Sequence, residues 1–317
     1  MAPARRTQEG AVLERNFSLL GPDEESGPEI LTRESGSEYQ LYASGRRYCQ
    51  AMVFTLDLKK RQDLFSLAYY ILNPRLDALF VEVFMNETSM PPIVLAIAPP
   101  KVAKELAKDN ADIVKFARKI EINRERCPSW PADKLAVYAE HSSVFYELMP
   151  EPLLEQVFNR ATWDTVGRYF KYLHFTSEAH LNGSREAAPA DKDAAKKAAE
   201  PPRNVLKFAL ALPPQDRMED LGRLMNMMMT FIDVVGTFKL SPEQQKRADR
   251  VRQEYEESKW KEAEKQRMEA IQEKKAQRKA EEKERVKNMS AEAYQKWEER
   301  QQRIQTKRAI KARTKKL

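Results

Sequence analysis

Eight lysines and arginines lie in the last 18 residues of this chain, a stretch without any aspartate or glutamate. Only amide, small, hydroxyl and aliphatic side chains separate these residues, which are Arg300, Arg303, Lys307, Arg308, Lys311, Arg313, Lys315 and Lys316. Uncompensated cations at this density bind phosphates in a salt-dependent, sequence-independent way. We predict that this basic tip contacts a polyanion, either RNA or anionic lipid. The alternative is a solvated charged helix without a specific ligand.

No constellation typical of an enzyme occurs beside this tip. Phosphate-binding loops, dinucleotide fingerprints, nucleophile elbows and zinc-protease motifs are all missing from the sequence. The consecutive acids at residues 23–25 lack the alternating ligand spacing of a calcium loop. The His-Ser-Ser triplet at residues 141–143 is interpreted as the entry to a helix rather than as a catalytic triad. We therefore expect no catalytic, cofactor-binding or metal-binding residues, and no small-molecule substrate.

Two cysteines, Cys49 and Cys127, are too few for a disulfide scaffold in 317 residues and are typical of a reducing compartment. The three histidines, His141, His174 and His180, do not follow the spacing of metal ligands. We interpret both cysteines as structural.

The charge of the chain separates an arm from a body. Residues 241–317 hold 24 Lys and Arg against 15 Asp and Glu, whereas residues 1–240 hold 31 against 33. Such asymmetry indicates a folded domain with an interaction tail. We predict an N-terminal segment and loop at 1–37, a globular domain at 38–240 with a flexible excursion at 184–202, and the arm at 241–317.

Apolar periodicity predicts alternating strands and helices in the body. The expected strands are 38–43 and 47–58 as a hairpin, 78–85 and 93–98 as a second pair joined by a polar turn, 172–176, and 204–212. The expected helices are 59–72, 100–118, three short ones at 142–148, 152–158 and 163–170, and 218–238. The pattern predicts an α+β fold, a mixed antiparallel sheet with packed helices. The methionine-rich face of the last helix is interpreted as core packing rather than as an adaptable binding surface.

The arm begins with a strong helix start, in which Ser241 is the cap, Pro242 the first helical residue and Gln244 completes the capping box. No glycine or proline follows, so residues 241–287 could form one helix of roughly 70 Å. Its apolar residues drift from heptad spacing, which favours a self-standing or surface-docked helix over a coiled-coil zipper. No apolar run in the chain reaches the ~20 residues of a membrane span.

Three segments carry a resemblance to a known family. They are residues 14–21 (ERNFSLLG), residues 39–74 with the run KRQDL, and residues 218–252 with the run LMNM. These segments resemble the calumin family, the coiled-coil-domain subunit of the PAT complex at the endoplasmic reticulum translocon. The likeness covers nearly the whole chain.

The resemblance implies a cytosolic α+β domain held at the endoplasmic reticulum membrane, with C-terminal helices that reach the ribosome and touch ribosomal RNA. With a small membrane partner, Asterix, the family acts as an intramembrane chaperone for multi-pass membrane proteins, and a link to calcium homeostasis is attributed to it. It implies the ribosome, an Asterix-like subunit and translocon components as partners. On this reading the eight tip residues contact ribosomal RNA, and the chain is a non-enzymatic adaptor.

One departure from the family pattern concerns the N-terminus. Family members carry a signal sequence, an acidic luminal stretch and one transmembrane helix ahead of the cytosolic domain, whereas residues 1–13 alone precede the ERNFSLLG segment here. A truncated form and a soluble relative are both compatible with this difference. The alternative function is a soluble RNA- or cytoskeleton-binding protein whose arm is a helical spacer.

Overall fold

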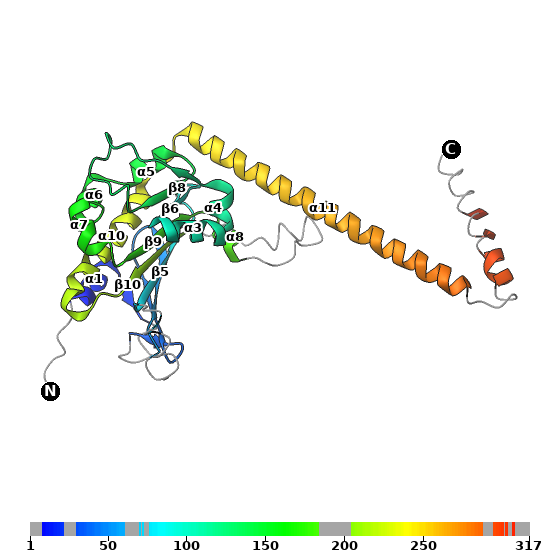
Figure 1. Ribbon diagram of the computed structural model, residues 1–317, viewed down its shortest axis with the longest axis horizontal. Helices are drawn as coiled ribbons and strands as arrows, with labels where there is room; N and C mark the ends of the chain where they lie inside the picture. Colours follow the sequence, from blue (N-terminus) through cyan, green and yellow to red (C-terminus); the bar gives the residue numbers. More distant parts are fainter. Residues whose placement is uncertain are drawn as a thin grey trace. The chain divides into compact units, whose positions relative to one another are not determined.

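The computed structural model describes residues 8–21, 30–60, 70, 72, 76–183, 204–287, 294–300, 302–303 and 306–307. The described residues up to Gln253 belong to one compact unit, and those from Glu254 onward belong to a second. The first unit contains a ten-stranded sheet in which every strand pair is antiparallel, with helices packed on both of its faces (Figure 1). The predicted α+β class is confirmed.

The strands run in the spatial order β1-β3-β4-β5-β10-β9-β6-β8-β7, and β2 pairs with β3. Their bounds are β1 Leu19–Leu20, β2 Thr32–Arg33, β3 Glu38–Ser44, β4 Cys49–Asp57, β5 Ala78–Met85, β6 Val94–Ala98, β7 Arg118–Ile120, β8 Ala136–Ala139, β9 Phe170–Thr176 and β10 Val205–Ala211. The predicted hairpin is confirmed as β3 and β4, and Gly45 after β3 takes the positive φ of +85° that favours glycine.

The second predicted strand pair is wrong in its pairing. Strands β5 and β6 form where expected, but β10 and β9 lie between them in the sheet. Strand β10 pairs with β5 from Val205↔Phe84 to Ala211↔Ala78, and β9 pairs with β6. Strands β9 and β10 are buried along most of their length, which suits central positions that neighbours cover on both sides.

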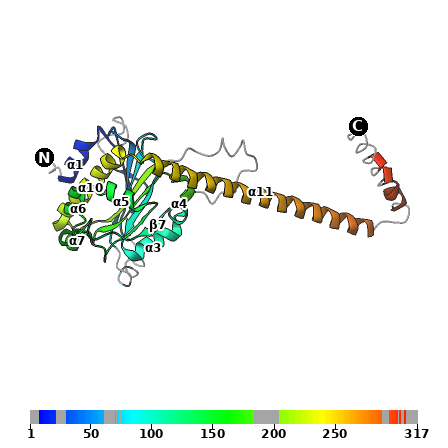
Figure 2. The same cartoon turned by 90° about the horizontal axis from the view of Figure 1, so that it is seen from above.

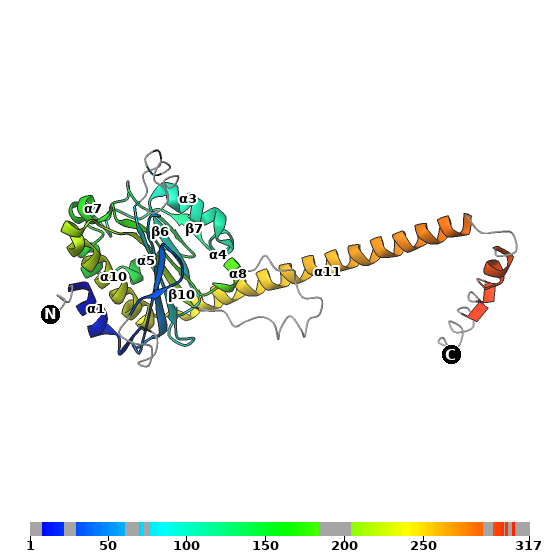
Figure 3. The same ribbon diagram turned by 90° about the horizontal axis from the view of Figure 1, so that it is seen from below.

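One face of the sheet carries the main core. Figure 3 shows α1 (Gln8–Asn16), α10 (Met218–Thr237) and α7 (Arg160–Val166) on this side, where α5 (Ser142–Leu148) and α6 (Glu151–Gln156) also pack. Phe231 of α10 meets Phe175 of β9 edge-to-face with ring centroids 5.1 Å apart. Four of the five α10 methionines are buried in this core, which confirms their packing role; they are Met225, Met227, Met228 and Met229.

The opposite face carries α3 (Pro100–Asp109) and α4 (Ala111–Phe116). They replace the single helix predicted for 100–118, because Asn110 leaves the helical region at φ −106° and ψ 113° and residues 118–120 form β7. Ala98 and Ala136 of the sheet meet Ala103 of α3. These small side chains allow the helix to approach the sheet closely.

Three further elements complete the described fold: α8 (His180–Gly183), the 3₁₀ turn η2 (Gln215–Arg217) and α11 (Pro242–Lys287). Helix α11 begins at the predicted capping box, where the Gln244 amide donates to Ser241 Oγ at 3.3 Å and the Ser241 amide donates to Gln244 Oε1 at 3.1 Å. Within the described residues, no helix has both the length and the apolar character to cross a membrane. The excursion at 184–202 and most of the helix predicted at 59–72 lie outside the described residues.

Candidate functional site

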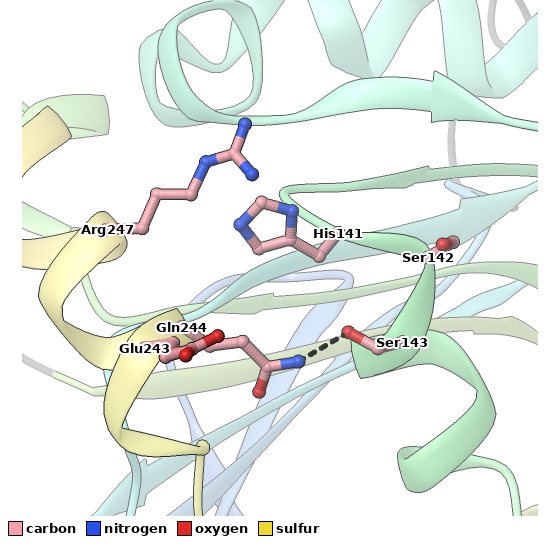
Figure 4. Close-up of a pocket in the computed structure, with 6 residues that line it drawn as sticks. All are labelled: His141, Ser142, Ser143, Glu243, Gln244 and Arg247. Atoms are coloured by element: carbon pink, nitrogen blue, oxygen red, sulfur yellow. Dashed lines mark hydrogen bonds between the residues drawn. The ribbon is translucent and has the colours of Figure 1, made fainter.

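The first three turns of α11 are attached to the body through residues spaced four apart, which share one face of the helix. The side-chain amide of Gln244 donates to Ser143 Oγ of α5 at 2.8 Å (Figure 4). Figure 2 shows the start of α11 near α5. One turn later Ala248 is 3% exposed, and Arg252 follows after another turn. Gln244 therefore both caps α11 and ties it to α5.

Arg252 is the polar centre of this attachment. Its Nη2 donates to Glu140 Oε1 at 2.7 Å and its Nε to Glu178 Oε1 at 2.6 Å. Nη2 also lies 3.2 Å from Ser177 Oγ, and the guanidinium carbon sits 5.2 Å from the centre of the Phe116 ring. The pKa of Glu140 is raised because burial disfavours its charge, and Arg252 opposes this only in part. One cation thus binds two mostly buried carboxylates, whose side chains are 10% and 12% exposed.

Beside this attachment are two adjoining hollows of about 310 and 410 Å³, which share His141, Ser142 and Arg247 in their walls. We call them together the basic groove. Helix α11 forms one wall, and the end of α4, strand β7 and the β8–α5 junction form the other. Five basic side chains line the groove: Lys115, Arg118, Lys119, His141 and Arg247. Figure 4 shows His141 and Arg247 pointing toward one another from opposite walls.

The electrostatics of the basic groove favour an anion. The pKa of His141 is lowered, first by burial and then by the positive charge of Arg247. The walls contain two acids. Glu140 is paired with Arg252, and Glu243 lies in the first turn of α11. The lowered pKa leaves His141 mainly uncharged at neutral pH, so the positive charge of the groove comes from Arg247, Lys115, Arg118 and Lys119. These four cations outnumber the carboxylate of Glu243, and a phosphate or carboxylate would neutralise the excess.

The predicted tip is only partly described. Arg300, Arg303 and Lys307 are helical and exposed, and their spacing of three and four places them on one side of a helix. The other five predicted residues lie outside the described residues; they are Arg308, Lys311, Arg313, Lys315 and Lys316.

An aromatic pair precedes these cations, and the sequence reasoning missed it. The rings of Tyr294 and Trp297 have centroids 6.0 Å apart, and Tyr294 is 43% exposed. Aromatic rings beside arginines are the surface on which unpaired bases stack. The sequence contains this signal, because the two aromatics lie three and six residues before Arg300.

The residues considered for reaction chemistry are not brought together. His141 precedes α5 and faces Arg247, while Ser143 bonds to Gln244 instead of to a base. Cys49 and Cys127 are buried free thiols, in agreement with their structural interpretation. In the part of the chain that the structure describes, no group of three or more His, Cys, Asp or Glu side chains could hold a metal ion.

The sequence reasoning also missed a buried polar pair. His174 Nε2 of β9 lies 2.8 Å from Asp112 Oδ2 of α4, and their side chains are 1% and 0% exposed. The hydrogen bond satisfies two groups that would be costly to bury alone. It fixes α4 on the sheet and has no route to solvent.

Comparison with known proteins assigns the family. Residues 6–308 match the family model of PAT complex subunit CCDC47. The chain is 30% identical over 250 residues to an uncharacterised protein of Arabidopsis thaliana, covering 79% of this chain and 48% of that protein. It is 28% identical to PAT complex subunit CCDC47 of Danio rerio (82% and 53% covered) and of Homo sapiens (83% and 54% covered).

The chain spans about half the length of the curated relatives it matches. The family model nevertheless covers the sheet, the helices and α11 together. The resemblance read from the sequence is confirmed. This chain belongs to the family of PAT complex subunit CCDC47.

Proposed function

We propose that this chain is a non-enzymatic adaptor of the multipass translocon at the endoplasmic reticulum. As a part of the PAT complex it assists the insertion and folding of multi-pass membrane proteins, while its C-terminal helices contact the translating ribosome. Its partners are ribosomal RNA, an Asterix-like small membrane subunit and translocon components, at the cytosolic face of the membrane. The observation that carries the proposal is a segregated run of basic residues at 300–316 in a member of the PAT subunit family.

The second unit supports this role by its charge and exposure. From Glu254 to Lys287 the described side chains of α11 are mostly exposed and charged, as expected of a spacer in water. The later segment presents Arg300, Arg303 and Lys307 as exposed helical cations. Clustered cations and nearby aromatics suit the phosphates and bases of RNA.

An adaptor needs binding surfaces rather than reacting groups. The first unit offers such surfaces, and the ionisable groups described above serve its structure: Arg252 holds two carboxylates, and Asp112 holds His174. In this proposal the small membrane subunit shields the polar membrane segments of the client. The present chain keeps that subunit beside the ribosome.

The test is co-sedimentation with ribosomes over a salt series. The full chain is compared with a variant in which the eight tip cations are changed to glutamine. A charge-conserving control exchanges lysine and arginine at the same eight positions. If the tip makes about six phosphate contacts, the slope of log K against log salt falls by about 4 to 5 in the glutamine variant. The control keeps the slope of the parent chain.

Equal binding by all three proteins would contradict an RNA contact at the tip. A chain that fractionates entirely away from membranes in cells would contradict the translocon role. That result would favour a soluble RNA- or cytoskeleton-binding protein with a helical spacer.

A further inference from the structure

The basic groove has no part in the function proposed for the tip. It lies in the first unit and combines residues far apart in the sequence, from α4, β7, the β8–α5 junction and α11. Arg118, Lys119 and Arg247 are exposed, and His141 is half-buried. The attachment of α11 by Gln244, Ala248 and Arg252 holds the two walls in place, so the groove is built before any ligand arrives.

The donor set fits phosphate oxygens. Arg247 offers a guanidinium fork, His141 a ring N–H, and Ser142 a hydroxyl in the wall that both hollows share. Arg118 and Lys119 line the second hollow but not the first. The two hollows therefore provide two neighbouring places for an anion, as a chain of linked phosphates requires.

We propose that the basic groove binds a short single-stranded segment of RNA through successive phosphates, with Arg247 and His141 at one phosphate and Arg118 and Lys119 at the next. The choice of RNA rests on the proposed function, which brings the chain to ribosomal RNA. The groove itself rests on the geometry of the first unit alone. It would be a second, independent contact to the same partner.

The shape of the site favours RNA over a membrane. The cations line two hollows between elements, whereas the headgroups of a bilayer form a plane. A single strand of RNA can follow a groove, and its backbone supplies the charge. The exposed side chains of Val114 and Val251 lie on elements of the two walls and offer apolar contact to a sugar or a base.

The first experiment measures the binding of a fluorescent ten-residue uridine oligonucleotide to the full chain. It uses the background in which the eight tip cations are glutamine, so that only other sites contribute. The groove variant is Arg118→Gln, Lys119→Gln and Arg247→Gln. The matched control is Lys101→Gln, Lys104→Gln and Lys108→Gln, which removes three exposed cations from α3 without touching the groove.

The groove variant is expected to reduce the slope of log K against log salt by about 1.4, because the contacts to two single-strand phosphates are lost. This corresponds to about 25-fold weaker binding at 0.1 M salt. The control keeps the parent slope. An equal loss of slope in both variants would mean that any three exposed cations contribute as much as those of the groove, and it would overturn the proposal.

A second experiment reads the site directly through the His141 ring. Two-dimensional NMR follows the ring protons of His141 during titration with the same oligonucleotide and with inorganic phosphate. The pKa of His141 is lowered first by burial and then by Arg247, and a bound phosphate is expected to raise it. The other charged residues in the walls of the two hollows that His141 lines are Lys115, Arg118, Lys119, Glu140 and Glu243. In the single variant Arg247→Gln this ligand-induced shift is lost. An unchanged His141 titration at saturating oligonucleotide would overturn the proposal.

The outcomes separate the groove from the tip. Ribosome binding that depends on the groove variant but not on the tip variant would reject the proposed tip contact and keep the groove. Ribosome binding that depends on the tip alone, with no oligonucleotide binding in the tip-neutralised background, would keep the tip contact and reject the groove. Binding to anionic vesicles or to an acidic peptide with no RNA binding would overturn the assignment to RNA.

Discussion

Gly236 near the end of α10 allows the β3–β4 hairpin to pack against that helix. A Cβ atom at this position would lie 2.7 Å from the Cβ of Tyr48, closer than two carbon atoms can approach. Tyr48 is itself held at φ 72°, a left-handed conformation that is strained for a tyrosine. Because the clash involves the Cβ of Tyr48, which the backbone fixes, a change of side-chain rotamer cannot relieve it.

We expect Gly236→Ala to lower the free energy of unfolding by about 1 to 3 kcal/mol, because the added methyl overpacks this contact. The matched control is Gly222→Ala in the same helix, where a Cβ would meet nothing within 4 Å. That change is expected to raise stability by up to about 1 kcal/mol through helix propensity. Urea unfolding of both variants measures the difference. Equal effects of the same sign would contradict the contact.

Glu140 gives the body a pH dependence whose sign follows from its burial. Its pKa in the folded protein is raised above the ordinary value of 4.5, so the folded state binds the proton more tightly than the unfolded chain. The stability from this group is fully present below pH 4.5 and is lost as pH rises through the folded pKa. The stability of the parent chain relative to Glu140→Gln should therefore increase as pH falls from 7 to 4.5.

Urea unfolding at half-unit pH steps measures this difference, and the glutamine variant removes the titration while it keeps the shape. Burial raises the pKa of Glu140 by more than the bond to Arg252 lowers it. A relative stability that falls toward pH 4.5 would mean that the ion pair dominates instead.

At this scale the sequence predicted residues whose function is local. Ser241 and Gln244 were assigned to a capping box three residues apart, and both hydrogen bonds of the box are present. Arg252 and Glu140 meet across 112 positions, and His174 and Asp112 across 62, so no periodicity could relate them. Their role depends on which elements the fold places side by side.

Among the elements, α11 is joined to the body by the charged side chain of Arg252 as well as by the hydrogen bond from Gln244 to Ser143. We expect Arg252→Met to lower the free energy of unfolding of the first unit by about 3 kcal/mol, because Glu140 and Glu178 would remain mostly buried without their cation. The matched control is Lys246→Met, an exposed residue on the same helix, with an effect within about 0.5 kcal/mol.

Thermal unfolding gives the loss, and proteolysis after residues 247 and 250 reports whether the first turns of α11 have detached. Similar melting of the two variants would contradict a central role for Arg252. Loss of stability without faster cleavage would mean that Arg252 stabilises the body but does not hold the first turns of α11 against it.

The elements were predictable where pattern and pairing are local. The β3–β4 hairpin has strand alternation around Gly45, and α10 has helical periodicity throughout. The insertion of β9 and β10 between β5 and β6 follows from long-range pairing of apolar strands, which sequence order does not determine. Strand β7 was missed because three residues, two of them charged, carry no alternation that could be recognised.

At the scale of the whole molecule, charge is divided between the body, residues 1–240, and the arm, residues 241–317. Residues 1–240 are close to neutral, and the excess of cations lies in residues 241–317. The basic groove is a second cluster of cations in the first unit, because it brings Lys115, Arg118 and Lys119 together with Arg247 of α11. A protein with a tip and a groove that both attract phosphate could hold an RNA surface at two points, and two linked contacts bind more tightly than either alone.

The two units should also differ in their local stability. Helix α11 beyond Gln253 is mostly exposed, so its helical hydrogen bonds gain little from packing, whereas α10 buries nine side chains. We expect amide hydrogen exchange to show protection close to the global stability in α10 and opening free energies of only about 1 to 2 kcal/mol in residues 255–287. Residues 242–253 should lie between these limits because Ala248 and Arg252 hold them.

Mass spectrometry of exchanged peptides measures this order, first at low salt and then at 1 M salt. Exposed pairs such as Lys265 and Glu269, whose charged atoms are 4.0 Å apart, are screened at high salt, so protection in 255–287 should fall further while that in α10 stays constant. Protection in 255–287 equal to that in α10 would mean that this segment is packed, for example against a second copy of the chain. Addition of ribosomes should raise protection around residues 294–307 if the tip is the contact, since bound helices open less often than free ones.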